Sequence, residues 1–428
     1  MSDTPRQARP PGARRRWRRR LVLLAPIVLA TLAALVLALW LALAPERAVP
    51  LVLGRIGASL GLDVSAEGDA ATRLGRHPVI VVRNLVVREP GEERPLLRAR
   101  RVQVALPWRT VRGLGDPLEL VRIELDDPEL DMPALQRWLA SRPPGDGRLP
   151  TLSDGLHVRN GRIVGHGWHV ATSALSLAQL RDDAPVRAQA SGRYQDGTTR
   201  VPFLLAATLQ RPASGRGFAV VGTVSPERDG WRLPARVTLS GGLHWKDGLA
   251  LLPARFGAAG RYASGDTVIP FALGLHGPLR AHAGAWTLVP AGIALRGEGL
   301  VPRLDARGRI ALGRRLLLQA DGDISRWPSA WPALPPPLGA SRQPLALTAA
   351  YLGPLDLGAP LALRVERDDL RFDGRLDVPA LVAWTSNPGQ GSLLPPVTGT
   401  LEAAAMEISG ARLEGVSVEF DAGTDPAP

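Results

Sequence analysis

The stretch from Leu304 to Leu312, Leu-Asp-Ala-Arg-Gly-Arg-Ile-Ala-Leu, has an apolar residue or a glycine at every second position, and most of the intervening residues are charged. Successive side chains of a β-strand point to opposite faces of its sheet, so this period of two predicts a strand with one apolar and one solvated face. The same alternation, with a glycine near its centre, recurs at residues 186–194, 218–224, 237–245, 316–324 and 370–378. The sequence therefore predicts an all-β fold.

The spacing of turn-forming residues predicts how many strands there are. Turn signals return at the interval that is typical of all-β proteins, so we expect roughly 18 to 20 strands. A compact sandwich needs fewer strands than this. We therefore expect an elongated, curved antiparallel sheet with a few short helices, about 90 Å long for strands that stack at their usual spacing.

The apolar face of this sheet has two possible roles. Glycines on that face permit sharp bending, which would make the face the lining of a groove with a taco-like cross-section. Alternatively, the face packs against a second sheet in a closed core. The residues expected to line it lie on the apolar phase of well-alternating strands: Phe218, Val220, Val224, Ile310, Leu312, Phe372, Leu376 and Val378.

The amino-acid composition excludes some fold classes and some kinds of catalytic and metal site. Glycine (46 residues) and proline (40 residues) make up about a fifth of the 428 residues, which excludes a protein of mainly long helices. The absence of cysteine excludes disulfides, thiolate metal sites and cysteine catalysis. Short helices are expected at residues 50–60 and 132–141, the second with Asp131 as its cap.

The N-terminus carries the signals of a membrane anchor. Much of the net charge of +12 comes from arginines in the first twenty residues, and residues 21–44 that follow contain no charged side chain. As a helix, this segment would be about 36 Å long, enough to cross a bilayer. Its flanking residues are suited to the membrane interface: Trp17, Arg18, Arg19, Arg20 and Trp40. The positive-inside rule then places residues 1–20 in the cytoplasm and everything from Pro45 onward across the membrane.

Two other interpretations of the N-terminus are weaker. Ala42-Leu43-Ala44 has the pattern of a signal-peptide cleavage site, but the apolar stretch is longer than a typical signal h-region. The arginine run would suit a nucleic-acid-binding arm, yet its neighbour is a membrane span, so no nucleic-acid partner is expected. Beyond the anchor we expect an N-terminal β region with short helices (45–145), a β-groove region (150–326), a proline-rich break (327–344) and a C-terminal β region (345–428).

Several segments together resemble a known family. The basic tail and membrane helix are followed by Gly-Leu-Asp-Val at residues 61–64, an amphipathic strand at 79–87, and LLRARRVQV at 96–104. LELVRIELDDPEL (118–130) and LHVRNGRIV (156–164) continue the pattern. This arrangement resembles the N-terminal region of the AsmA family of Gram-negative envelope proteins. The match covers residues 15–165, and the later β repeats are similar only in style.

The resemblance implies a function. Relatives in this superfamily, including TamB-like proteins, form long β-grooves that shelter lipid acyl chains between the inner and outer membranes. This chain would then be a single-pass inner-membrane protein whose periplasmic groove binds or helps transfer phospholipid or lipopolysaccharide in outer-membrane biogenesis. Its expected partners are membrane lipids, the inner membrane and other envelope proteins, and no cofactor is expected. The expected sheet is shorter than the largest bridging members of the superfamily.

A search for catalytic or metal-binding residues finds two candidates, and neither has the geometry that its chemistry requires. Ser59 lies in a literal G-x-S-x-G, but a nucleophile elbow must follow a buried strand, and the residues before Ser59 are helix-like. His166 and His169 would face opposite ways in an extended chain, with no acid nearby to complete a zinc site. We therefore expect a protein that is not an enzyme. The alternatives are a structural or scaffold component of the envelope or of a secretion machine, with a closed β-sandwich core, and a hydrolase that uses Ser59.

Overall fold

The computed structural model describes residues 61–421, apart from residues 69, 74, 109–118, 142–150, 213–214, 246–248, 283–284, 329, 332–338, 340, 342, 356, 387–395 and 409–410. The expected basic tail, membrane helix and short helix at residues 50–60 lie outside the described residues, and so do all five anchor residues and Ser59. Within the described part, no helix is both long and apolar enough to cross a bilayer.

Strands make up most of the described chain. The first part contains β1 (Asp63–Ala66), β2 (Ala70–Arg73), β3 (Val79–Arg88), β4 (Pro95–Ala105), β5 (Glu119–Leu120), β6 (Arg122–Asp131), α5 (Met132–Ser141), β7 (Thr151–Leu152), β8 (Leu156–Val164) and β9 (Trp168–Leu177). The middle contains β10 (Val186–Asp196), β11 (Thr199–Leu209), β12 (Arg216–Val224), β13 (Glu227–Arg228), β14 (Trp231–Arg232), β15 (Ala235–His244), β16 (Ala250–Ser264), β17 (Thr267–His282) and β18 (Ala285–Gly297). The last part contains β19 (Arg303–Leu312), β20 (Leu316–Arg326), β21 (Leu345–Gly353), β22 (Leu361–Arg367), β23 (Leu370–Leu376), α6 (Val378–Ser386), β24 (Val397–Ile408) and β25 (Ala411–Phe420).

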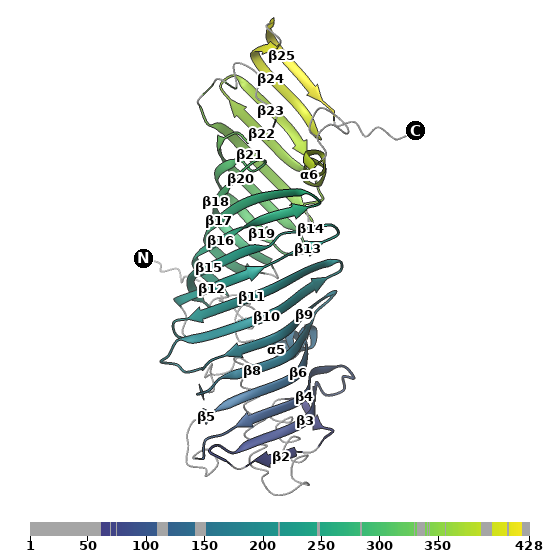
Figure 1. The fold of residues 1–428 in the computed structure, drawn as a ribbon, viewed down its shortest axis with the longest axis vertical. Helices are drawn as coiled ribbons and strands as arrows, with labels where there is room; N and C mark the ends of the chain where they lie inside the picture. Colours follow the sequence, from purple (N-terminus) through teal and green to yellow (C-terminus); the bar gives the residue numbers. More distant parts are fainter. Residues whose placement is uncertain are drawn as a thin grey trace, which may run out of the picture.

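One sheet of 23 strands forms the whole length of the molecule. Its long strands pair largely in chain order, β3–β4–β6–β8–β9–β10–β11–β12–β15–β16, and then each strand with the next as far as β25. Figure 1 shows these strands stacked along the long axis. The expected all-β fold and elongated sheet are confirmed.

The sequence predicted a wholly antiparallel sheet, and this prediction is wrong at one pairing. β6 and β8 pair in parallel, and α5 forms the connection between them. The reason lies at Asp131, the last residue of β6, whose side-chain oxygen Oδ1 accepts a hydrogen bond from the backbone N–H of Ala134 at 2.8 Å. This N-cap starts a helix that carries the chain back along the sheet, so β8 begins at the same end as β6. The helix itself, 132–141, has the predicted bounds.

Two strands contain an internal irregularity. In β6, Asp127 takes a positive φ of 48°. In the middle of β8, Asn160 has a φ of 52°. Both residues fall at gaps in the pairing register, so they mark local irregularities rather than ends. The proline-rich segment 327–344 connects β20 directly to its hydrogen-bonded neighbour β21, so the sheet continues past it.

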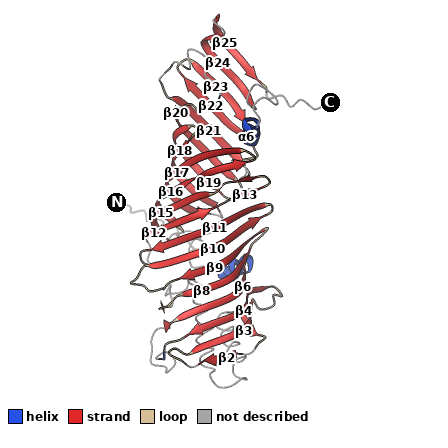
Figure 2. Cartoon of the chain, in the orientation of Figure 1, coloured by secondary structure: helices blue, strands red, loops and turns tan. Residues whose placement is uncertain are grey.

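The first strands of the sheet are covered by a hydrophobic core. This core contains side chains of β3, β4, β6 and β8, with four residues of α5 packed against them: Ala134, Leu135, Trp138 and Leu139. Figure 2 shows α5 as a helix beside the first part of the sheet, where it contacts β4 and β6. In contrast, the second buried cluster of the described chain is small and contains only Leu370, Ala403 and Met406. Between these clusters the described sheet carries no comparable core.

Candidate functional site

The strand register brings the predicted apolar phases together on one face of the sheet, which we call the apolar face. Directly paired residues lie on the same face, so a row of partners can be followed across the sheet. One such row contains one residue from each of nineteen strands: Ile80, Val104, Ile123, Leu156, Leu177, Ala188, Ala207, Val220, Leu239, Phe256, Leu275, Ile293, Ala306, Gly322, Leu347, Val365, Phe372, Leu401 and Val418. Every member is apolar or glycine.

The residues predicted to line this face occupy it, with one exception. Val220 and Phe372 belong to the row itself, and five others lie on the same phase of β12, β19 and β23: Phe218, Val224, Ile310, Leu312 and Leu376. Val378 does not continue β23, because the strand ends at Leu376 and Val378 begins helix α6. The carboxylate of Asp377 accepts a hydrogen bond from the backbone N–H of Ala380 at 2.8 Å and so caps that helix.

The apolar face is more sheltered than the opposite face beyond the N-terminal core as well, and some of its side chains there are buried, such as Leu345 (1% exposed) and Ile324 (4% exposed). Neighbouring residues of the same type show this. Val221, on the opposite face of β12, is 51% exposed, whereas Val220 is half-buried. In β11, Leu204 is 60% exposed and Leu205 is half-buried. The two faces of a flat single sheet would be equally exposed, so this difference indicates that the sheet curves around its apolar face.

Glycines of the apolar face account for the curvature. A Cβ at Gly308 would project from this face, where it would overlap the carbonyl oxygen of Gln319 in the neighbouring strand. A Cβ at Gly222 or Gly322 would likewise overlap the backbone of the strand beside it. The neighbouring backbone therefore rises on the apolar side at these points, which means that the sheet folds toward that side. The apolar face is thus the inside of the fold, and only glycine permits so close an approach.

Aromatic residues lie at one margin of the apolar face. Trp168 and Tyr194 have ring centroids 5.9 Å apart where β9 begins and β10 ends. Trp231 stacks on Tyr262 at 6.0 Å where β14 meets the end of β16. Burial and the nearby Asp196 carboxylate raise the pKa of Tyr194, so its hydroxyl remains protonated at neutral pH. These rings combine an apolar body with a polar edge, which suits a boundary between apolar chains and water.

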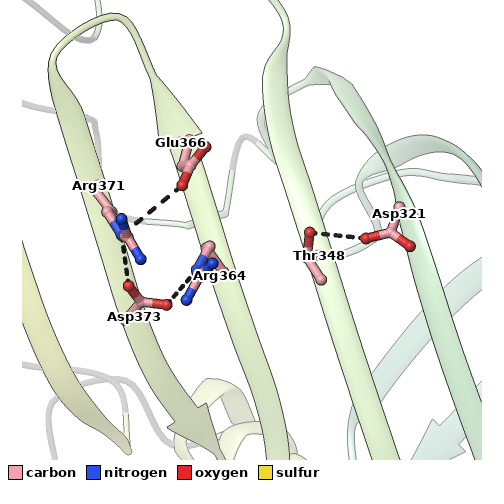
Figure 3. Close-up of polar contacts among 6 residues, drawn as sticks. All are labelled: Asp321, Thr348, Arg364, Glu366, Arg371 and Asp373. Carbon is pink, nitrogen blue, oxygen red and sulfur yellow. Dashed lines mark hydrogen bonds and ion pairs between the residues drawn. The ribbon is translucent and has the colours of Figure 1, made fainter.

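The opposite face carries charged and polar side chains. In β22 and β23, the Asp373 carboxylate accepts hydrogen bonds from Arg364 Nε at 2.5 Å and Arg371 Nε at 2.7 Å (Figure 3). These two guanidinium groups hold the pKa of Asp373 below its usual value. In the adjoining strands the Thr348 hydroxyl donates to Asp321 at 2.9 Å. Paired charges of this kind keep the outer face solvated.

A shallow hollow of about 620 Å³ lies over this polar face, between β21 and β24. Its lining includes Thr348, Arg364, Asp373, Arg375 and Thr398. The hollow forms because the paired residues Ala350 and Ala362 are short while the side chains beside them are long. It is open to solvent and lies on the opposite side of the sheet from the apolar row.

Catalytic or metal-binding clusters are not found in the described residues. No group of three or more His, Asp or Glu side chains there could hold a metal ion. The most buried charged side chain described is Asp126, which pairs with Arg101 at 2.6 Å and faces Arg159 at 3.7 Å. Its partners lie on the two neighbouring strands, β4 and β8. The cluster therefore connects all three strands at the point where β6 and β8 pair in parallel. Sequence reasoning could not find this cluster, because the three residues are far apart in the chain.

No family model, curated protein or solved structure matches this chain. The resemblance to the AsmA family therefore stays a prediction from the residues quoted above.

Proposed function

We propose that this chain binds lipid acyl chains along its apolar face and helps to transfer phospholipid or lipopolysaccharide in outer-membrane biogenesis. The observation that carries the proposal is the row of apolar residues across nineteen strands, which from β10 onward lies on the more sheltered face of the sheet and outside the N-terminal core. From β10 to β23 this face has charged side chains only near strand ends, such as Asp196 and Arg216. A ligand for such a surface must itself be long, flexible and apolar.

The physical mechanism needs no catalytic group. Each buried CH₂ contributes about 0.8 kcal/mol relative to water, so an acyl chain that leaves a bilayer regains most of its burial on this face. The contacts are non-directional, so chains could move along the row with little change in free energy. Head groups would project from the groove into water, and selectivity among lipids with similar chains would be low.

The location follows from the proposed anchor. A membrane helix at residues 21–44, with residues 1–20 in the cytoplasm, would place the sheet in the periplasm of a Gram-negative cell. The groove would then begin close to the inner membrane, where phospholipid and lipopolysaccharide are available. Other envelope proteins would complete the path to the outer membrane.

Photo-crosslinking in cells tests the proposal. A photoreactive amino acid at Ile310 or Phe372, both on the apolar face, should capture phospholipid or lipopolysaccharide that mass spectrometry identifies on the purified protein. The matched control is Arg309, the neighbour of Ile310 on the polar face, which should capture far less. Equal capture at Arg309 and Ile310, or no lipid at either apolar position, would show that the face does not bind lipid.

The scaffold alternative has support from one region only. The closed core under β3 to β8 is of the kind that a scaffold protein would have along its whole length. That alternative predicts no lipid at Ile310 or Phe372 and no lipid that co-purifies with the protein.

A further inference from the structure

Helix α5 lies on the same face that the proposed function assigns to lipid. The apolar row is continuous across it: Ile80, Val104 and Ile123 are members of the row, just as Leu239 and Val365 are. The first three are 3% exposed or less, whereas the last two are half-buried. The low exposure of Ile80, Val104 and Ile123 comes from α5 and the residues packed with it in the N-terminal core.

The apolar side chains of α5 occupy the place on the apolar face that a bound apolar ligand would occupy. Ala134, Leu135, Trp138 and Leu139 all face the sheet and are 5% exposed or less. The helix is also held at its outer side, where Arg137 Nη2 lies 3.3 Å from Glu89 Oε1 at the end of β3. It thus fills the inside of the curve over β4 and β6, leaving no open apolar surface there for another chain.

We infer that α5 is a built-in stopper of the groove. Lipid acyl chains bind on the apolar face from β10 onward and end at α5, and they do not reach β3 to β6 while the helix stays in place. This inference rests on the proposed function and adds to it the point at which the lipid-binding part of the groove ends. Lipid from the end of the sheet nearest the proposed anchor must enter over the open margin of the groove, or α5 must first move aside.

The fold explains why such a helix is present at this point. The parallel pairing of β6 with β8 requires a crossover, and a crossover helix must lie against one face of the sheet. The opposite face at this position carries the Arg101–Asp126 pair and the exposed Arg100. The apolar side of a helix packed there would remove the water that solvates these charged groups. The helix therefore lies on the apolar face, where it displaces any other occupant.

The test places photoreactive residues at two members of the same row. Leu156 of β8 packs against the N-terminal core to which α5 belongs, and Leu239 of β15 lies outside that core. In the full-length protein in cells, we expect a lipid adduct at Leu239 and only the background level of the Arg309 control at Leu156. Trp138→Ala removes the largest side chain of the stopper and should raise the adduct at Leu156 several-fold, with the adduct at Leu239 unchanged.

Each other outcome contradicts a particular statement. Strong adducts at both Leu156 and Leu239 without the substitution would overturn the stopper and leave the lipid-binding function intact. Trp138→Ala that keeps the adduct at Leu239 but gives none at Leu156 would also overturn it, since the retained adduct shows that the groove is folded. No adduct at either position would overturn the proposed function and the stopper together.

Discussion

At the scale of single residues, the glycines of the apolar face have the clearest structural role. The sequence shows a glycine near the centre of strand after strand, and the register places these glycines on the inner side of the curve. The reason for each glycine could not be read from the sequence, because it depends on the backbone of another strand. At Gly308 that backbone is the carbonyl of Gln319, eleven residues away in the chain.

Gly308→Ala should lower the stability of the protein. The added methyl group would force β19 and β20 apart, and overpacking of this kind costs about 1–3 kcal/mol. The matched control is Gly274→Ala in β17, where the nearest atom to the added carbon is 3.8 Å away, in Ala294. That change should be neutral or slightly stabilising, because alanine restricts the unfolded chain more than glycine does. Denaturant unfolding of both variants measures the difference, and equal stabilities would contradict the proposed role of Gly308.

At the scale of elements, local signals decided which predictions were right. Helix α5 was predictable because Asp131 offers a cap, Pro133 lies in the first turn and the apolar residues follow a helical period. Helix α6 was missed because Val378 extends the alternation of β23 by one more step, although Asp377 and Pro379 also form a helix start signal. In β6, Asp126-Asp127-Pro128 has the composition of a turn, but pairing with β4 and β8 extends the strand through it.

The cap of α5 has a measurable contribution. Asp131→Ala removes the acceptor for the Ala134 N–H and should lower the free energy of unfolding by about 1 kcal/mol. Asp377→Ala removes the equivalent cap from α6, which is not part of a large core, and should have a smaller effect on global unfolding. Circular dichroism during urea titration would measure both. A larger loss for Asp377→Ala would contradict the view that α5 is the better-anchored helix.

At the scale of the whole molecule, the period of two was sufficient to predict an all-β chain with one apolar face. It could not predict whether that face is covered. Coverage depends on which strands pair and on the parallel pairing of β6 with β8, which directs α5 onto the face, and both are long-range properties. The described sheet has its one large core over the first strands, and an open groove over the remaining strands is part of the proposed function.

This division predicts two levels of local stability in one sheet. Amide hydrogens of β3, β4 and β6 lie beneath a buried core, so their exchange requires global unfolding of that part. Strands β10 to β22 have water on one face and a half-buried apolar face on the other, and we expect their amides to exchange faster. Hydrogen exchange followed by mass spectrometry should therefore show strong protection before residue 160 and weaker protection after residue 186.

Added phospholipid should slow exchange only in the second region, because acyl chains would supply there the apolar layer that α5 already supplies to the first. Uniform protection along the sheet, or slowing by lipid in β3 to β6, would contradict this description of the molecule.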